Sequence, residues 1–273
     1  MNEVPRIGFI GGGNMANALI GGLVRNKTGA SFVVIEPHEA TRAALETKFG
    51  VRAHSVPHPD LAGCDAIVFA VKPQQFREAA DAVREFVAGR LVVSIAAGIR
   101  STDISRWLGG HPLVIRCMPN TPALIGAGIT ALFAAPAVGE DQKALAETLL
   151  GAVGETLWVD DETQLDAVTA LSGSGPAYVF YFVEAMERAA AELGLDADTG
   201  RRLAIATFLG ASKLAAQSDE PVSTLRERVT SKGGTTFAAL TSMDAERVSD
   251  AIVRAIHAAN VRSKELGDEL GKE

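Results

Sequence analysis

The sequence predicts an α/β N-terminal domain with a mostly parallel, doubly wound sheet, followed by an all-α C-terminal domain. In residues 6–159, short apolar runs typical of strands alternate with segments of helical periodicity, which is the pattern of a parallel sheet wrapped by helices. After residue 160 this alternation stops, and long alanine-rich helical segments follow. The chain has 273 residues, enough for two domains of ordinary size. We expect the first domain to span residues 1–160 and the second residues 161–273.

The strands of the first domain are expected at short apolar runs. They lie at residues 6–11, 33–36, 65–71, 91–97, 112–118, 128–134 and 155–159. The helices between them are expected at residues 14–25, 39–49, 74–87, 102–108 and 140–153. The last two strands are expected at one edge of the sheet.

The second domain is expected to contain helices at residues 176–193, 197–217 and 245–266. The segment 197–217 carries Ala204 and Phe208 on one apolar face and Leu203 and Leu214 on another. A helix that is apolar nearly all round is usually buried, in a core or between subunits. The domain is therefore a candidate for oligomerisation, although a self-contained helical bundle would also bury this helix.

Charge and hydropathy argue against several classes of function. The net charge is −7 and no basic stripe is visible, so the sequence does not predict nucleic-acid binding. The N-terminal segment lacks the basic and apolar regions of a signal peptide. The longest uncharged run, residues 117–139, contains three prolines and is therefore not expected to cross a membrane. We expect a cytoplasmic protein without membrane or nucleic-acid partners.

Metal-binding and disulfide patterns are not evident in the sequence. It has two cysteines, Cys64 and Cys117, and five histidines, without the spacing of a zinc site. His54 and His58 are four residues apart, but Pro57 lies between them, so a shared helical face is not expected. We expect no metal site, and two lone cysteines fit a reducing compartment.

A glycine-rich turn links the first expected strand to the first helix. Its pattern is Gly11-x-Gly13-x-x-Ala16, which is typical of dinucleotide-binding folds. Gly11 permits the tight turn, Gly13 lets a pyrophosphate approach the backbone, and Ala16 allows close packing of the helix on the strand. Free amides at the start of the helix would bind the phosphates. The residues assigned to the cofactor here are Gly11, Gly12, Gly13, Asn14 and Met15.

Glu36 ends the second expected strand, 20 residues after Ala16. A carboxylate at this position accepts hydrogen bonds from the adenosine ribose of a dinucleotide, so Glu36 is also assigned to the cofactor. It would repel a 2′-phosphate, which favours NADH over NADPH, but His38 and Arg42 lie near it in the sequence and could offset this charge. An exposed glutamate at a strand end is the alternative interpretation.

Three further strand ends carry small or polar residues. In an open α/β sheet, the carboxyl ends of the strands line the ligand crevice. We therefore expect a groove on the nicotinamide side, although Lys72 could equally be a surface lysine. The residues assigned to this groove are Ala70, Val71, Lys72, Pro73, Ala96, Ala97, Gly98 and Asn120.

Two glycine-rich segments interrupt the helical domain, at residues 171–177 and 229–236. Consecutive small and hydroxyl residues expose backbone N–H groups, which form a concave anion site at a helix start. The segments are the best candidates in this domain for holding a small carboxylate, although a simply capped loop could have the same composition.

The chain resembles the pyrroline-5-carboxylate reductase family over nearly its whole length. The resemblance rests on GFIGGGNMA at residues 8–16, FAVKPQ at 69–74, SIAAGI at 94–99 and IRCMPNTPA at 115–123. In the helical domain it rests on DAVTALSGSGPAY at 166–178 and VTSKGGTT at 229–236. One departure is local: the stretch after Met243 is shorter than the family's usual glycine-containing turn before the last helix.

The resemblance implies a Rossmann-type first domain, a dimerisation domain, and reduction of 1-pyrroline-5-carboxylate to L-proline with NADPH or NADH, the last step of proline biosynthesis. It also implies an intertwined dimer or a ring of dimers, with an active site that includes residues of two chains. By resemblance, Thr236 and Ser231 are the catalytic candidates. The residues implied for the substrate are Met118, Thr169, Asp219, Val229, Thr230, Ser231, Gly233, Gly234, Thr235 and Thr236, and those implied beside the nicotinamide are Gly173, Ser174, Gly175 and Pro176.

Two alternative functions are weighed against this one. A β-hydroxyacid dehydrogenase shares the two-domain layout, but it needs a general base, usually a lysine after a glycine-rich helix start. Residues 177–180 contain no lysine, and Lys213 lies in the middle of an expected helix. A non-catalytic NAD(P) sensor would keep the first glycine turn and could lose the loop at 229–236, but this chain retains both.

Overall fold

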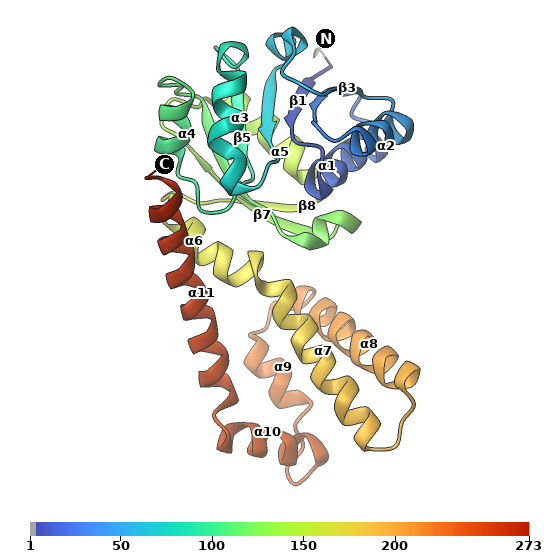
Figure 1. Ribbon diagram of the computed structural model, residues 1–273. Helices are drawn as coiled ribbons and strands as arrows, with labels where there is room; N and C mark the ends of the chain where they lie inside the picture. Colours follow the sequence, from blue (N-terminus) through green and yellow to red (C-terminus); the bar gives the residue numbers. More distant parts are fainter. Residues whose placement is uncertain (1–3, 273) are drawn as a thin grey trace. The chain divides into compact units, whose positions relative to one another are not determined.

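A computed structural model of the chain describes residues 4–272. Within them, eight strands form one sheet in the order β3-β2-β1-β4-β5-β6-β7-β8 (Figure 1). Neighbouring strands are parallel, except that β6 and β7 run antiparallel. The strands are β1 (Arg6–Ile10), β2 (Ser31–Ile35), β3 (Arg52–His54), β4 (Ala66–Phe69), β5 (Leu91–Ser94), β6 (Val114–Met118), β7 (Gly128–Ala134) and β8 (Gly154–Trp158).

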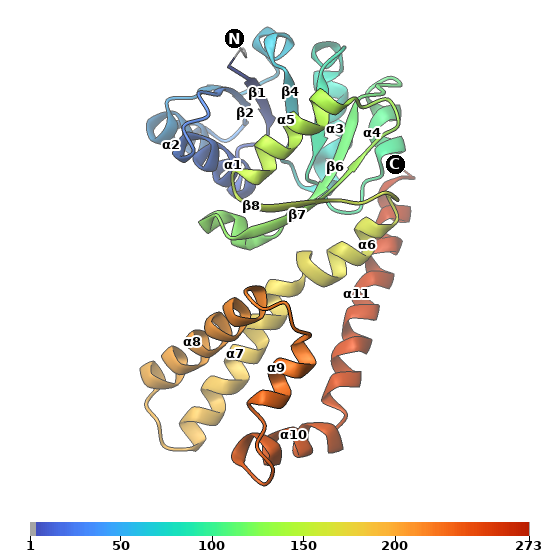
Figure 2. The ribbon, with the colours of Figure 1, turned by 180° about the vertical axis from the view of Figure 1, so that it is seen from behind.

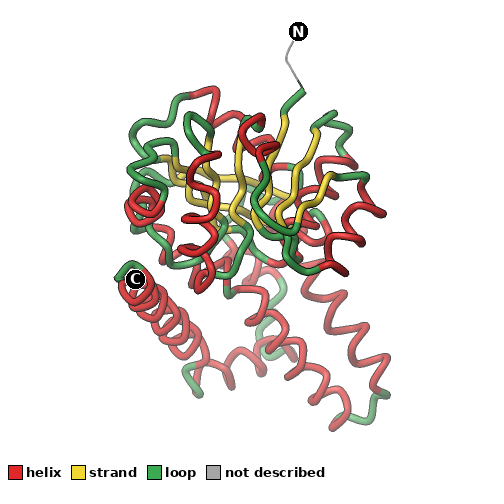
Figure 3. The backbone as a smooth tube through the Cα atoms, turned by 45° about the horizontal axis from the view of Figure 1, so that its top comes forward, coloured by secondary structure: helices red, strands yellow, loops and turns green. Residues whose placement is uncertain are grey.

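Helices cover both faces of the sheet, as the alternation of strands and helices predicts. Helices α1 (Asn14–Arg25), α2 (Glu39–Phe49) and α5 (Glu140–Gly151) pack on one face, and α3 (Phe76–Val83) and α4 (Ser101–Trp107) on the other (Figures 1 and 2). Figure 3 shows the strands enclosed between these two helical layers. The predicted doubly wound α/β domain is therefore confirmed.

The second face of the sheet is built around aromatic side chains. Phe76 of α3 stacks on Phe69 of β4 with ring centroids 4.7 Å apart, and it lies 5.9 Å from the ring of Trp107 on α4. On the first face, Leu19 and Leu23 of α1 are buried with the core strands. These apolar contacts hold β1, β4, β5 and β6 in fixed register, so the carboxyl ends of these strands are held beside one another.

Contacts divide the described chain into two compact units, residues 4–174 with 259–272 and residues 175–258. The sequence instead places the domain boundary at residue 160. The difference arises because helix α6 (Gln164–Val168) packs on β6 and β7, and because the last turns of the chain return to the first unit. The backbone of α11 at Gly267 is in close contact with the loop after β5, since an added Cβ on Gly267 would lie only 3.0 Å from the carbonyl oxygen of Gly98.

The second unit contains α7 (Gly175–Glu192), α8 (Ala197–Ala216), α9 (Val222–Arg228), α10 (Thr235–Ala245) and the first half of α11 (Val248–Leu270). The described residues after β8 form no strand, so the predicted all-helical C-terminal region is confirmed. Asp196 caps α8 by accepting a hydrogen bond from the N–H of Thr199 at 2.9 Å. In the described part of the chain, no helix has both the length and the apolar character needed to cross a bilayer.

Candidate active site

The glycine-rich turn joins β1 to α1. Gly11 has φ +94°, and an added Cβ there would lie 2.7 Å from the carbonyl oxygen of Ala70 and 3.1 Å from Cγ1 of Val71. At Gly13, the N-cap of α1, an added Cβ would meet no atom within 4 Å. The turn is thus packed against the end of β4 on one side and leaves the backbone open at the start of α1, next to the exposed Asn14. Because the first N–H groups of a helix lack helical partners, this opening fits a pyrophosphate.

Glu36 follows β2 and is fixed by two backbone N–H groups. Its Oε2 accepts a hydrogen bond from Gly12 at 2.8 Å, and its Oε1 accepts one from His38 at 2.9 Å. The residue is 7% exposed, so it is not the exposed glutamate of the alternative interpretation. Glu36 and the glycine turn lie together, as the dinucleotide-binding pattern requires.

The predicted strand-end residues follow β4 and β5, which neighbour each other in the sheet. Lys72 is exposed and precedes a short 3₁₀ turn, Pro73–Gln75. Gly98 has φ +79°, which turns the chain sharply after β5. Ala96 and Gly98 are buried, whereas Lys72 is exposed, and the contacts of these strand ends with a cofactor stay predictions.

Met118 ends β6 and meets a π-helical turn, Thr169–Gly173, which follows α6. The N–H of Ser174 donates to the carbonyl oxygen of Thr169 at 2.8 Å and closes this turn. An added Cβ on Gly173 would overlap Cε of Met118, and it would lie 3.8 Å from Cγ2 of Thr169. Single π-helical turns are frequent at functional sites. The fold therefore brings Met118 and Thr169, which the sequence analysis assigns to the substrate, together with Gly173, which it assigns to the cofactor.

The side chain of Asn120 forms hydrogen bonds within the protein. Its Oδ1 accepts a hydrogen bond from the N–H of Ile129 at 3.0 Å, and its Nδ2 donates to the carbonyl oxygen of Ser172 at 3.2 Å. The amide ties the π-helical turn to the beginning of β7. Its direct contact with a cofactor stays a prediction.

In the second unit, the predicted carboxylate loop leads into α10. Gly233 has φ +73°, and Gly234 is the N-cap, with its N–H donating to the carbonyl oxygen of Ser231 at 3.0 Å. Ser231 and Thr235 are exposed, and Thr236 is half-buried in the first turn of the helix. An accessible helix start flanked by hydroxyl groups can hold an anion.

Other assigned residues of this unit lie at helix ends. Gly175 and Pro176 open α7, Asp219 follows α8 in an exposed position, and Val229 is exposed after α9. The hydroxyl of Thr230 donates to the carbonyl oxygen of Arg226 at 2.6 Å. Their contacts with a substrate stay predictions.

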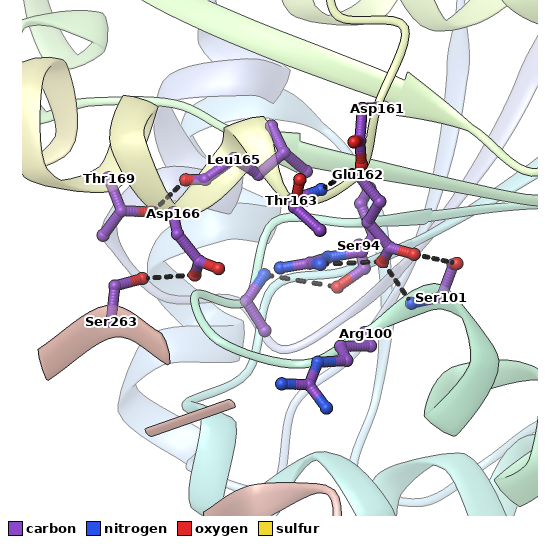
Figure 4. Close-up of polar contacts among 12 residues, drawn as sticks. Ser94, Arg100, Ser101, Asp161, Glu162, Thr163, Leu165, Asp166, Thr169 and Ser263 are labelled. Carbon is purple, nitrogen blue, oxygen red and sulfur yellow. Dashed lines mark hydrogen bonds and ion pairs between the residues drawn. The ribbon is translucent and has the colours of Figure 1, made fainter. Parts of the chain in front are cut away.

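The sequence reasoning missed a buried ionic network in the first unit. Nη1 of Arg116, on β6, lies 2.7 Å from Oε1 of Glu162. The same carboxylate accepts hydrogen bonds from the N–H and the hydroxyl of Ser101 at 2.6 and 2.7 Å (Figure 4). Asp166 accepts from the hydroxyl of Ser263 at 2.7 Å. The network borders a cavity of about 330 Å³. An arginine inside the apolar run 112–118 was a signal for such a partner, but nothing in the sequence pointed to Glu162.

His54, His58 and Asp60 bring three possible metal ligands within 4.8 Å of one another. The two imidazole rings stack with centroids 3.9 Å apart and an interplanar angle of 2°. A metal binds in the plane of an imidazole, so parallel stacked rings cannot both direct a lone pair at one ion. The guanidinium groups of Arg6 and Arg52 lie 3.5 and 3.9 Å from the Asp60 carboxylate and supply positive charge there. This cluster does not have the geometry of a metal site.

The two cysteines are free and buried. Burial raises the pKa of the Cys64 thiol to about 11 and raises the pKa of the Cys117 thiol well above its ordinary value. Since the thiolate is the reactive form of cysteine, neither thiol is suited to covalent catalysis near neutral pH.

The open cradle at Gly13 and the carboxylate fixed beside it place the chain among the NAD(P)-binding proteins of the doubly wound class. Comparison with known proteins narrows the class. Residues 6–98 match the family described as NADP oxidoreductase coenzyme F420-dependent, and residues 162–266 match the family described as pyrroline-5-carboxylate reductase dimerisation.

Individual relatives agree along the whole chain. The pyrroline-5-carboxylate reductase of Pseudomonas aeruginosa is 43% identical over 99% of this chain and 100% of its own. A solved pyrroline-5-carboxylate reductase from Coxiella burnetii has a TM-score of 0.91 at 37% identity, covering 97% of this chain and 99% of that one. The NADP-bound pyrroline carboxylate reductase of Plasmodium falciparum has a TM-score of 0.86 at 28% identity, with the same coverage. The chain belongs to the pyrroline-5-carboxylate reductase family.

Proposed function

We propose that the protein reduces the C=N bond of 1-pyrroline-5-carboxylate to give L-proline, the last step of proline biosynthesis. The observation that carries the proposal is the loop before α10, whose accessible backbone and hydroxyl groups suit a small carboxylate. When bound, NADPH or NADH supplies the hydride that the imine carbon accepts. An imine nitrogen is readily protonated, so the reaction depends on placing substrate and charge rather than on a strong base.

The groups of this chain hold the substrate and position its proton. The loop and the start of α10 bind the carboxylate through Ser231, Gly233, Gly234 and Thr235. The hydroxyl of Thr236 donates a hydrogen bond to the ring nitrogen or relays its proton. Further contacts with the substrate are assigned to Met118, Thr169, Asp219, Val229 and Thr230.

The cofactor is assigned along the glycine turn and the strand ends. Its pyrophosphate is bound at Gly11–Met15, and its adenosine ribose at Glu36. The residues assigned to the nicotinamide side are Ala70, Val71, Lys72, Pro73, Ala96, Ala97, Gly98, Asn120, Gly173, Ser174, Gly175 and Pro176.

The test is oxidation of NAD(P)H by the purified protein in the presence of 1-pyrroline-5-carboxylate, followed by absorbance. The variant Thr236→Ala should lower kcat/KM about tenfold, because one lost hydrogen bond is worth about 1–2 kcal/mol. Thr241→Ala is the matched control, since the Thr241 hydroxyl donates to the carbonyl oxygen of Phe237 within the same helix. Ser231→Ala should mainly raise KM. Wild-type kinetics in Thr236→Ala would remove this hydroxyl from the mechanism, and a pure kcat effect in Ser231→Ala would contradict carboxylate binding.

We also propose that the helical unit pairs two copies of the chain, as a dimer or as a ring of dimers, with an active site that includes both chains. Among the described residues of α8, Gly200 and Ala204 alone are buried, whereas Leu203, Leu209 and Leu214 are each more than half exposed. An apolar surface of this kind indicates an interface. Sedimentation analysis should find an oligomer, and a fully active monomer would refute the proposal.

We place this enzyme in the cytoplasm. Its two free, buried cysteines support a reducing compartment. Its partners in this proposal are the substrate, the product proline, the cofactor and copies of itself, without nucleic acid or membrane. Fractionation of cells should recover the protein with cytoplasmic markers.

A further inference from the structure

We propose that the enzyme selects NADH over NADPH, and that Glu36 enforces the choice; the inference rests on the proposed cofactor site. The two cofactors differ in the 2′-phosphate of the adenosine ribose. In a doubly wound fold this ribose lies beside the end of the second strand, and Glu36 stands directly after β2. The charges around Glu36 therefore decide whether a 2′-phosphate is accepted.

The Glu36 carboxylate cannot easily turn away. Both of its oxygens accept backbone hydrogen bonds, from Gly12 and from His38. Its Cγ and Cβ also pack on the turn, since an added Cβ on Gly12 would lie 3.2 and 3.3 Å from them. Each carboxylate oxygen keeps a further lone pair, so it can still accept from a ribose hydroxyl. A phosphate in the same place would meet a negative charge that is held still.

Arg42, the positive charge of the neighbouring helix that could offset this carboxylate, is held against the backbone of the strand end. Nη1 of Arg42 donates to the carbonyl oxygens of Glu36 and Pro37 at 2.8 and 2.6 Å, which ties the guanidinium to the backbone. These two bonds use both N–H groups of Nη1, so three of the five guanidinium donors, on Nη2 and Nε, remain for a phosphate. Lys48 lies in the last turn of α2, whereas Glu39 adds an acidic residue to the first turn. The NADP named for the Plasmodium relative thus does not suit the end of β2 in this chain.

The experiment titrates the full-length protein with NADH and with NADPH and follows nicotinamide fluorescence to obtain both Kd values. We expect the Kd for NADPH to exceed that for NADH by about tenfold or more at low ionic strength. Added salt should narrow the difference, because it screens the repulsion. Glu36→Gln keeps the size and an acceptor oxygen but removes the charge, so it should shift the ratio toward one. Glu39→Gln, at an exposed position three residues away, is the matched control and should shift the ratio far less.

The outcomes are distinguishable. Equal or tighter binding of NADPH by the wild-type protein would overturn the inference while leaving the proposed reductase function intact. A Glu36→Gln variant with an unchanged Tm and an unchanged ratio would also overturn it. If Glu36→Gln fails to fold, the ratio of the NADPH and NADH Kd values of the wild-type protein, and the dependence of this ratio on salt, still test the inference. Binding of neither cofactor would overturn the proposed cofactor site, and this inference with it.

Discussion

Replacing Gly13 with alanine should separate the stability of the fold from binding of the cofactor. Gly13 has φ −67° and ψ −169°, a conformation that alanine adopts without strain, and the new Cβ would meet no atom within 4 Å. The methyl group would stand where a pyrophosphate has to approach the start of α1. Charge-assisted hydrogen bonds to a phosphate are worth about 1.5–3 kcal/mol, so losing one raises Kd about ten- to hundredfold.

The assay for Gly13→Ala combines a fluorescence titration with NADH and a thermal melt. Gly11→Ala should lose both binding and stability, because its φ is +94° and its Cβ would lie 2.7 Å from the Ala70 carbonyl oxygen. Gly151→Ala, in the last turn of α5, also places its Cβ where no atom lies within 4 Å; it should leave Kd unchanged and should not lower Tm, because alanine favours a helix over glycine. An unchanged Kd in Gly13→Ala, or a Tm as low as that of Gly11→Ala, would refute this reasoning.

Three further substitutions, each with a comparison variant, test the stability of the first unit by thermal or urea unfolding at matched protein concentration. Gly22→Ala should cost about 2 kcal/mol or more, since its Cβ would overlap the Ala152 carbonyl oxygen and lie 2.9 Å from Cγ1 of Val153. Gly21→Ala, which faces the flexible edge of Phe49 at 3.3 Å, should cost less; equal costs would contradict the packing argument. Lys27→Gly should stabilise the protein by about 0.5–1 kcal/mol, because Lys27 lies two residues after the end of α1 with φ +52°, whereas Lys27→Ala keeps the Cβ and should bring no gain. Glu162→Ala should cost about 3 kcal/mol by leaving the buried Arg116 without its carboxylate, and adding Arg116→Met should recover most of that loss; no recovery would show that charge is not the cause.

The elements of the sheet could be predicted because each depends on a local pattern. Apolar runs located every strand except β3, whose three residues, Arg52 to His54, give no apolar alternation. The domain boundary depends on contacts instead. The sequence pattern of a helix such as α6 is the same whether the helix packs on the sheet or on other helices. Residue 160 is therefore where the strand–helix alternation ends, whereas the boundary between the two packed units lies further along the chain.

In the candidate site, too, features set by neighbouring residues could be predicted from the sequence, whereas contacts with residues distant in the chain could not. The turn at Gly11 and Gly13 depends on the backbone conformation of a few consecutive residues. Its glycine pattern could therefore be recognised in the sequence. The side chain of Asn120 was assigned to a cofactor from its place after β6, but its amide bonds with the backbone of Ile129 and Ser172. Its position could be predicted, whereas its hydrogen-bond partners could not.

The ionic network explains why such partners escape a reading of the sequence. Arg116 and Glu162 are 46 residues apart, and Asp166 and Ser263 are 97 residues apart. A buried charge requires a partner but does not say where in the chain the partner lies, because any element that the fold brings near can supply it. Glu36 differs from these residues because its partners, Gly12 and His38, belong to the turn and the strand end that define its position. The selectivity proposed for Glu36 therefore rests on contacts within the dinucleotide-binding pattern itself, together with the orientation of Arg42, which the structure supplies.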